Sequence, residues 1–263
     1  MKSVLITGAY GGMGGAAAKL LSENGYRVFA LDRTVGDPDA NIIPVCADIT
    51  SEEEVQNAYA AVRQQCESLD AIVHFAGIYM LDSLVEMEAE AFDKIFDVNL
   101  RGVFLINKIF LPLLKEKSKI LITTSELAPL DPLPFTGIYA VSKAALDKYA
   151  YSLRMELQLL GVSVSVLRAG AVKTDMLGAS TAALDRFCDK TELYCCNAKR
   201  FKRIVEGVEA RNIEPQRIAA KAYRVLGKRN PSFAYSINRN PLLLLLNVLP
   251  KRMQLFAIRM ILK

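Results

Sequence analysis

The sequence predicts an α/β protein with a doubly wound, Rossmann-like parallel sheet in a single domain, followed by a C-terminal helical extension. Short runs of β-branched and other apolar residues alternate with longer segments of helix-favouring composition. Such alternation is typical of a parallel sheet that helices cover on both faces. The chain of 263 residues is long enough to bury one sizeable core, and no linker or internal repeat divides it. We therefore expect one domain over residues 1–263.

Six apolar runs are the predicted strands: residues 3–6, 26–31, 41–45, 70–77, 119–125 and 162–167. Each run is short and apolar along its length, as a strand buried on both faces requires. The segments between them are long enough for crossover helices, most clearly residues 51–65 and 144–161. Thr50 or Ser51 precedes three glutamates, which suits the positive end of a helix, and Gly161 is a suitable stop for the second helix.

The composition narrows the class of protein. Five cysteines form no CxxC pair, and with one histidine they match no zinc-site spacing, so we expect no metal and a reduced, cytoplasmic protein. Glycines follow the short apolar start, so no secretory signal is expected. Binding to nucleic acid needs basic residues across a folded face. The formal charge of +5 instead comes from the tail, residues 239–263, which has no acid and holds Arg239, Lys251, Arg252, Arg259 and Lys263.

A glycine-rich turn follows the first predicted strand, in the sequence VLITGAYGGMGG at residues 4–15. Glycine lets a backbone turn sharply or approach a ligand closely, and the helix that follows would direct free N–H groups at an anion. A nucleoside triphosphate loop is disfavoured, because it needs a lysine within the motif and the first lysine after the turn is Lys19. A dinucleotide is expected, although the turn by itself is also compatible with a plain tight turn.

The end of the second predicted strand bears on which dinucleotide binds. Asp32 stands close to the ~20-residue separation from the first glycine, Gly8, at which a carboxylate accepts the adenosine ribose hydroxyls. A carboxylate there would repel a 2′-phosphate, so NAD(H) is favoured. Arg33 is its neighbour and could pair with that phosphate, which keeps NADP(H) as the alternative.

Tyr139 and Lys143 stand four residues apart in IYAVSKAAL, on one face of a predicted helix. The ammonium would favour the ionised phenol by Coulomb attraction, and a tyrosine otherwise titrates too high for proton transfer at neutral pH. Ser125 ends the preceding strand, at the edge of the sheet where a substrate would lie. These three residues predict acid/base chemistry on a bound substrate.

The TGxxxGxG spacing and the YxxxK motif together resemble the short-chain dehydrogenases/reductases over residues 1–235. The resemblance implies a tetrad in which Asn99 holds a proton-relay water, Ser125 orients the substrate oxygen, Tyr139 is the general acid/base and Lys143 binds the nicotinamide ribose. It also implies cofactor contacts from Gly8, Tyr10, Gly11, Gly12, Met13, Gly14, Asp32, Arg33, Asp48, Ile49, Ala76, Gly77, Asn99, Tyr139, Lys143, Val172 and Thr174. His74 stands where the family usually has asparagine, and we expect a packing or hydrogen-bonding role for it.

The resemblance implies an oxidoreductase that moves a hydride between NAD(P) and an alcohol/ketone pair, and a homodimer or homotetramer built through the long helices. The alternative is a nucleotide-sensing protein of the same fold that has lost turnover. All four tetrad positions are filled, which argues against that alternative.

The substrate end varies most within the family, and we expect residues 175–210 to cover the substrate. Candidates for an apolar wall are Met176, Leu177, Leu184, Phe187, Leu193, Tyr194 and Phe201, although each could instead be ordinary helix packing. Such a wall would suit an apolar alcohol or ketone, steroid-like or long-chain.

The tail, residues 239–263, is too interrupted by polar residues and proline to span a bilayer. A helix from Pro250 would be too apolar to stand free in water. It would dock on its own domain or a neighbouring subunit, or lie in an anionic membrane surface as a peripheral contact.

Overall fold

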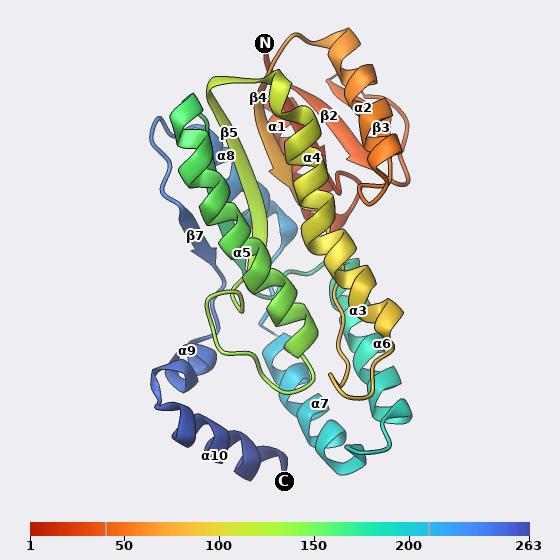
Figure 1. Ribbon diagram of the computed structural model, residues 1–263, viewed down its shortest axis with the longest axis vertical. Helices are drawn as coiled ribbons and strands as arrows, with labels where there is room; N and C mark the ends of the chain where they lie inside the picture. Colours follow the sequence, from red (N-terminus) through yellow and green to blue (C-terminus); the bar gives the residue numbers. More distant parts are fainter. Residues whose placement is uncertain (40, 210) are drawn as a thin grey trace.

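The computed structural model describes residues 1–39, 41–209 and 211–263, without the side chains of 175–177, 179–181, 208 and 209. Within these residues one parallel sheet has the strand order β3-β2-β1-β4-β5-β6-β7 (Figure 1). The strands are β1 (Lys2–Thr7), β2 (Tyr26–Asp32), β3 (Ile42–Cys46), β4 (Leu69–His74), β5 (Leu114–Ser125), β6 (Ser163–Ala169) and β7 (Ala234–Ile237). The order and the parallel pairing confirm the predicted doubly wound fold.

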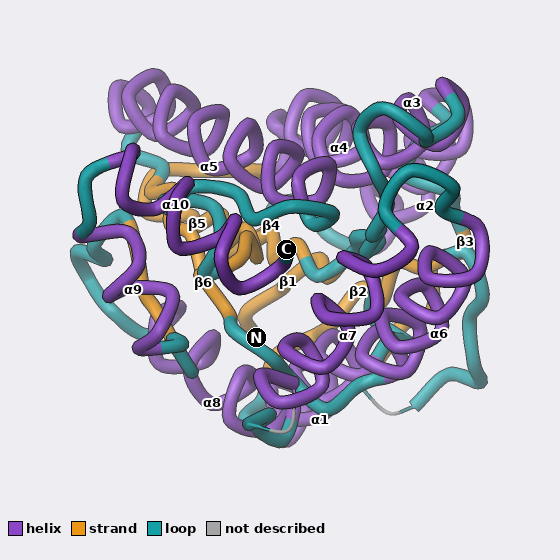
Figure 2. The backbone as a smooth tube through the Cα atoms, turned by 90° about the horizontal axis from the view of Figure 1, so that it is seen from below, coloured by secondary structure: helices purple, strands orange, loops and turns teal. Residues whose placement is uncertain are grey.

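Helices cover both faces of the sheet (Figure 2). One face carries α2 (Glu52–Gln65), α4 (Gly102–Phe110) and α5 (Gly137–Leu157), and the other carries α1 (Gly12–Glu23) and α8 (Pro215–Leu226). A hydrophobic cluster fills each interface, and fully buried Phe29 and Phe110 belong to the first. The strands are therefore apolar on both faces, which explains their continuous apolar sequence.

Two predicted helix ends are confirmed. The hydroxyl of Ser51 caps α2 by accepting a hydrogen bond from the backbone N–H of Glu54 at 3.3 Å. Gly161 ends the short 3₁₀ turn after α5 (Gln158–Leu160) with φ +71°, a left-handed conformation that glycine adopts without a steric penalty.

The crevice of the fold lies between β1 and β4. After β1 the chain continues to β2 on one side of the sheet, and after β4 it continues to β5 on the other side. The carboxyl ends of β1 and β4 are therefore separated by a crevice, which is where ligands of such folds bind. Helices gather at this end of the sheet in Figure 1: α3 (Ala89–Phe96), α6 (Asp175–Lys190), α7 (Cys195–Glu209), α9 (Pro241–Val248) and α10 (Lys251–Leu262).

The C-terminal extension is helical, as predicted, and folds back on its own domain. Leu262 of α10 is buried in a third cluster with Leu184, Phe187 and Phe201, and Ile258 packs against that cluster. The tail is also held by polar contacts, since Asn247 Oδ1 accepts a hydrogen bond from the backbone N–H of Asp131 at 2.7 Å. Among the described residues no helix combines the length and the apolar composition needed to cross a bilayer.

Candidate active site

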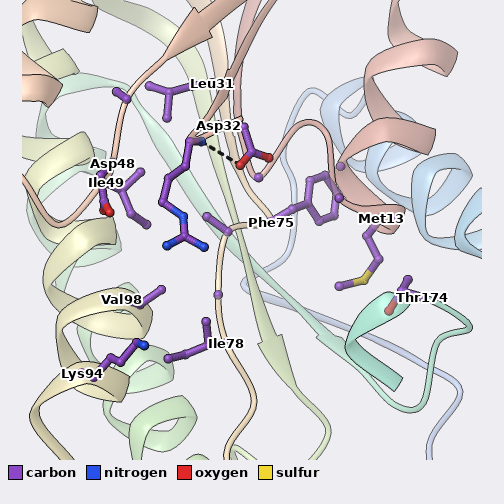
Figure 3. Close-up of a pocket in the computed structure, with 18 residues that line it drawn as sticks. Met13, Leu31, Asp32, Asp48, Ile49, Phe75, Ile78, Lys94, Val98 and Thr174 are labelled. Carbon is purple, nitrogen blue, oxygen red and sulfur yellow. Dashed lines mark hydrogen bonds between the residues drawn. The ribbon is translucent and has the colours of Figure 1, made fainter. Parts of the chain in front are cut away.

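A cavity of about 340 Å³ lies at the carboxyl ends of β1, β2 and β4 (Figure 3). Its walls come from the glycine turn, the ends of β2 and β3, the loop after β4, α3 and the start of α6. The lining residues predicted as cofactor contacts are Gly8, Gly11, Gly12, Met13, Gly14, Asp32, Arg33, Asp48, Ile49, Ala76, Gly77 and Thr174. These residues converge on one cavity although they come from five separate segments of the chain.

The glycine turn fits the diphosphate of a dinucleotide. Gly8 has φ +69°, and a Cβ there would lie 2.6 Å from the backbone nitrogen of Ala76; a Cβ at Gly14 would lie 1.9 Å from the carbonyl oxygen of Gly8. Only glycine permits this close approach of β1, the turn and the loop after β4. Helix α1 begins at Gly12 without a side-chain cap, which leaves its first-turn N–H groups open to an anion.

Asp32 is fixed by two backbone N–H groups at the edge of this cavity. Its Oδ2 accepts a hydrogen bond from Tyr10 at 3.0 Å, and its Oδ1 accepts one from Arg33 at 2.8 Å, the dashed line in Figure 3. Tyr10 therefore shapes the site by its backbone and does not line the cavity. Among the described residues no cation forms an ion pair with this carboxylate, which leaves it able to accept hydrogen bonds from a ribose.

Asp48 lies across the cavity from Asp32 (Figure 3). Its Oδ1 accepts hydrogen bonds from both the N–H and the hydroxyl of Thr50, each at 2.8 Å. Burial raises the pKa of the Asp48 carboxyl, but these hydrogen bonds and the charge of Arg33 outweigh it, so the pKa is below its ordinary value. Asp48 is therefore ionised at neutral pH and attracts the Arg33 guanidinium.

Sequence reasoning missed six residues of this cavity: Leu31, Ala47, Phe75, Ile78, Lys94 and Val98. Leu31 and Ala47 directly precede the predicted acids Asp32 and Asp48, so their place in the sequence could have identified them as cavity residues. Lys94 and Val98 are four residues apart, on the helical segment that leads to Asn99, and share a helix face. Lys94 is exposed and brings a second cation to the cavity.

A second cavity of about 230 Å³ adjoins the first, because Met13, Phe75, Gly77 and Thr174 line both. Ser125, Tyr139, Lys143 and Val172 line the second cavity as well. The predicted cofactor and catalytic residues therefore surround two connected spaces. Other residues of the second cavity were not predicted; they include Thr123, Glu126, Leu127, Leu133, Ile204, Val205 and Leu243.

Ser125, Tyr139 and Lys143 are among the polar residues that line the second cavity. The side chains of Ser125 and Tyr139 are hydrogen-bonded to each other. Desolvation raises the pKa of the Tyr139 phenol well above its ordinary value, and the Ser125 hydrogen bond only partly offsets this. Burial lowers the pKa of Lys143 to about 8. Lys143 Nζ donates a hydrogen bond to the carbonyl of Thr123 at 3.4 Å.

Asn99 is fully buried and lies in a π-helical turn, Asp97–Arg101, between α3 and α4. Its Oδ1 accepts from the N–H of Ile78 at 2.8 Å, and its Nδ2 donates to the carbonyl of Ile78 at 3.0 Å and to Ser142 Oγ at 3.1 Å. Asn99 lines neither cavity. The structure shows that Asn99 holds the loop after β4 and that its Oδ1 lies beside Gly77, where an added Cβ would come within 3.0 Å of it.

His74 lies at the end of β4, only 2 % exposed, and its Nε2 is hydrogen-bonded to Asn107 Oδ1 at 2.9 Å. Burial lowers the pKa of His74 to about 4, so the ring is neutral at physiological pH. His74 lines neither cavity, in agreement with the packing role expected from the sequence. Its Nδ1 is one of two buried side-chain atoms without a hydrogen-bond partner among the described residues; the other is Thr123 Oγ1.

Among the described candidates for an apolar wall in residues 175–210, one lines the second cavity, and Ile204 and Val205 of the same segment line it as well. Leu184 and Phe187 are buried in the third hydrophobic cluster, and Leu193 is 67 % exposed. Tyr194 packs on the same cluster against the ring of Phe135. Phe201 lines the second cavity, whereas Met176 and Leu177 lie outside the residues whose side chains are described. The helices of this segment mostly bury their apolar faces against each other.

The sequence matches the family model described as short chain dehydrogenase over residues 2–185. The match covers more than half of the chain, and the fold and both cavities agree with it. The chain belongs to the short-chain dehydrogenase family.

Three relatives align with this chain over different lengths. Estradiol 17-beta-dehydrogenase 2 from Mus musculus is 33 % identical over 193 residues, covering 68 % of this chain and 50 % of that protein, so the chain spans about half the length of this relative. A 3-ketodihydrosphingosine reductase from Bacteroides thetaiotaomicron is 24 % identical and aligns over 97 % of this chain and 96 % of that protein. An NADPH-dependent 1-acyldihydroxyacetone phosphate reductase from Schizosaccharomyces pombe is 33 % identical over 69 % of this chain and 65 % of that protein.

Solved structures show the same fold at low sequence identity. A short chain dehydrogenase family protein from Francisella tularensis superposes with a TM-score of 0.76 at 22 % identity, covering 90 % of this chain and 97 % of that one. A 3-ketoacyl-(acyl-carrier-protein) reductase from Brucella melitensis, complexed with NADH, gives 0.73 at 24 % identity over 90 % and 96 % of the two chains.

Proposed function

We propose that this protein is an NAD(P)-dependent oxidoreductase that interconverts an alcohol and its ketone, with Tyr139 as the general acid/base. The observation that carries the proposal is that Ser125, Tyr139 and Lys143 line a cavity that opens into the glycine-turn cavity. A dinucleotide in the first cavity and a carbonyl in the second would then meet at their shared wall, which includes Thr174.

The two adjoining cavities together offer a partner for each part of a dinucleotide. The N-terminus of α1 would hold the diphosphate, Asp32 the adenosine ribose, Lys143 the nicotinamide ribose and Thr174 the carboxamide. When bound, the nicotinamide supplies or accepts the hydride. Fixing both reactants in one orientation removes much of the entropic barrier to their reaction.

The proton steps belong to the residues of the second cavity. In ketone reduction Tyr139 donates its phenolic proton to the substrate oxygen, and in alcohol oxidation the phenolate takes that proton. Ser125 is hydrogen-bonded to the phenol of Tyr139 and would orient the substrate oxygen. The ammonium of Lys143, whose Nζ lies 5.8 Å from the centre of the Tyr139 ring, would stabilise the phenolate that forms.

We propose a preference for NAD(H). The Asp32 carboxylate is fixed at the ribose end of the cavity and would repel a 2′-phosphate. Arg33 supports the alternative, NADP(H), although its guanidinium is already attracted to the ionised Asp48.

We propose an apolar, long-chain carbonyl as the substrate. Leu127, Leu133, Ile204 and Leu243 give the second cavity apolar walls around the Ser125–Tyr139 pair. Two relatives support this class by name, since 3-ketodihydrosphingosine and 1-acyldihydroxyacetone phosphate are both ketones with long or acyl chains.

We further propose that the tail, residues 239–263, binds an anionic membrane surface peripherally. Helices α9 and α10 leave eight large apolar side chains more than half exposed: Leu242, Leu245, Val248, Met253, Leu255, Phe256, Met260 and Ile261. The same segment holds five cations and no acid, which complements anionic headgroups at ~1 kcal/mol for each cation near the surface. Leu243 of α9 lines the substrate cavity, so the exposed surface adjoins the place where an apolar substrate would enter.

We propose a homodimer or homotetramer formed through α4 and α5. Both helices expose large side chains away from the sheet, among them Phe104, Tyr151 and Met155. Light scattering on the eluted protein measures the assembly, and a purely monomeric protein at micromolar concentration would contradict the proposal.

The deciding experiment for the activity is a screen of alcohols and ketones with both dinucleotides, followed by the change in nicotinamide absorbance. Turnover of at least one long-chain carbonyl, absent from Tyr139→Phe, is expected. Tight dinucleotide binding without turnover of any substrate would favour the nucleotide-sensing alternative.

A further inference from the structure

Glu126 places a carboxyl group inside an otherwise largely apolar substrate cavity. It directly follows Ser125 at the carboxyl end of β5, is 8 % exposed and lines the second cavity. Its backbone N–H donates to the carbonyl of Ala169 at 2.9 Å, which ties this residue to the end of β6. The sheet therefore fixes the backbone of Glu126 directly after Ser125.

The two oxygens of Glu126 have different surroundings. Oε2 accepts a hydrogen bond from the backbone N–H of Asn240, at 2.5 Å. Oε1 lies beside Gly170, where an added Cβ would come within 3.0 Å of it. Among the described residues no lysine or arginine forms an ion pair with Glu126, and the exposed Arg239 acts on it only through its Coulomb field.

An unpaired carboxyl in such a place is costly. Removing a carboxylate from water without a cationic partner is unfavourable, and here burial raises the pKa of Glu126 above its ordinary value. The charge of Glu126 also raises the pKa of Tyr139, which opposes the proton transfer proposed for that phenol. A cation bound at Glu126 would remove both penalties.

We propose that Glu126 recognises a protonated amine that the substrate carries close to its reacting carbonyl carbon. This inference rests on the proposed oxidoreductase function and names the class of substrate as a long-chain amino ketone or its amino alcohol. The amine pairs with Oε1 of Glu126, the alkyl chain lies along the apolar walls, and the carbonyl oxygen meets Ser125 and Tyr139. Glu126 is thus a specificity residue whose occupation also favours ionisation of Tyr139.

The test compares three long-chain ketones that differ only at the carbon next to the carbonyl: one with an amine, one with a hydroxyl and one with a methyl group. Each is assayed with the wild type, with Glu126→Gln and with Asp131→Asn. Glutamine keeps an oxygen that accepts the Asn240 hydrogen bond, so it removes the charge with little change in shape. Asp131 is a matched control, because it is another carboxyl that contacts the tail, through Lys251, but lies outside the cavity.

We expect the wild type to favour the amino ketone over the methyl ketone in kcat/KM by roughly tenfold or more, as a charge-assisted hydrogen bond would give. Glu126→Gln abolishes this preference, so that its kcat/KM values for the amino ketone and the methyl ketone become similar. Asp131→Asn keeps the preference. The proposal is overturned if Glu126→Gln lowers kcat/KM equally for all three ketones. It is also overturned if the wild type prefers the hydroxy ketone over the methyl ketone as strongly as it prefers the amino ketone, and Glu126→Gln loses both preferences.

Failure of the proposed activity gives a different result. If no ketone is turned over, binding of a long-chain amino alcohol to the dinucleotide-loaded protein is measured by calorimetry. Weaker binding to Glu126→Gln than to the wild type and Asp131→Asn, by roughly tenfold, would still support amine recognition. Equal binding to all three proteins would contradict it.

Discussion

Lys143 Nζ lies 5.8 Å from the centre of the Tyr139 ring, one turn away on α5, and both side chains line the same cavity. Lys143 is only 6 % exposed, so its charge is poorly screened by water. The ring of Tyr79 packs against that of Tyr139, with the two ring centres 4.7 Å apart. The phenol and the ammonium are therefore coupled in a site of low polarity.

Tyr139→Phe removes the proposed acid/base and keeps the ring that packs against Tyr79. We expect turnover to fall by roughly 10²–10⁴-fold, the range that a positioned proton donor contributes, with the dissociation constant of the dinucleotide nearly unchanged. Steady-state rates and fluorescence titration of the dinucleotide measure the two quantities. Retention of more than a few per cent of the parent rate would show that another group transfers the proton.

The pH dependence of ketone reduction is expected to report Lys143. Its pKa of about 8 means that the ammonium is present below pH 8 and is lost as the pH rises through that value. Because the charge stabilises the phenolate that forms when Tyr139 donates its proton, kcat/KM should fall above about pH 8. In Lys143→Met the rate should be lower and should lack this decline; an unchanged decline in the variant would assign it to another group.

Asp32 and Arg33 are expected to act on dinucleotide choice in opposite directions. Asp32→Ala should raise kcat/KM for NADP(H) relative to NAD(H), because it removes the charge that repels a 2′-phosphate. Arg33→Ala should lower the NADP(H) value by roughly tenfold and leave NAD(H) nearly unchanged, because only the phosphate uses the guanidinium. A wild type with the higher kcat/KM for NADP(H) would refute the NAD(H) preference.

His74 is expected to make the fold sensitive to acid. The unfolded chain takes up a proton near pH 6.5, whereas the buried ring resists protonation until about pH 4. The neutral ring therefore contributes stability that is fully present above pH 6.5 and is lost as the pH falls toward 4, about 3 kcal/mol in all. Urea unfolding of wild type and His74→Asn between pH 7 and 4 measures this loss, and the variant should lose correspondingly less. Parallel pH profiles for the two proteins would contradict the assignment.

Membrane binding is expected to depend on the exposed apolar residues of the tail. Leu245→Gln with Phe256→Gln should reduce co-sedimentation with vesicles rich in phosphatidylserine, and raised salt should weaken binding of the wild type because the basic residues are screened. Leu159→Gln with Leu160→Gln is the matched control, since both residues are exposed apolar side chains outside the tail. Equal sedimentation of the two double variants, or none of the wild type at low salt, would leave only the docking role.

Local features of the sequence determined much of the fold and of the first cavity. Six of the strands, the cap at Ser51 and the stop at Gly161 are readable because each follows from nearby residues and their backbone preferences. The glycine turn and Asp32 can be predicted from the sequence for a related reason. They stand at the ends of strands, and the parallel order of those strands brings their carboxyl ends to one crevice.

Contacts between distant segments decided the rest. β7 is four residues long and forms by pairing with β6. No periodicity in its own sequence predicts this strand. Leu184 and Phe187 carry the same apolar character as Phe201 and belong to the same hydrophobic cluster, yet of the three only Phe201 also lines the substrate cavity, a difference that depends on how α6 and α7 pack.

The carboxyl of Glu126 shows the same limit at the active site. By sequence it is an ordinary acid after Ser125, and its burial comes from Asn240, 114 residues away, whose backbone N–H reaches it when the tail folds back over the sheet edge. The sequence by itself determined which residues can carry the chemistry, because catalytic side chains and glycine turns follow local rules. Only the tertiary structure decided what surrounds them, because burial and cavity shape depend on segments that the chain brings together on folding.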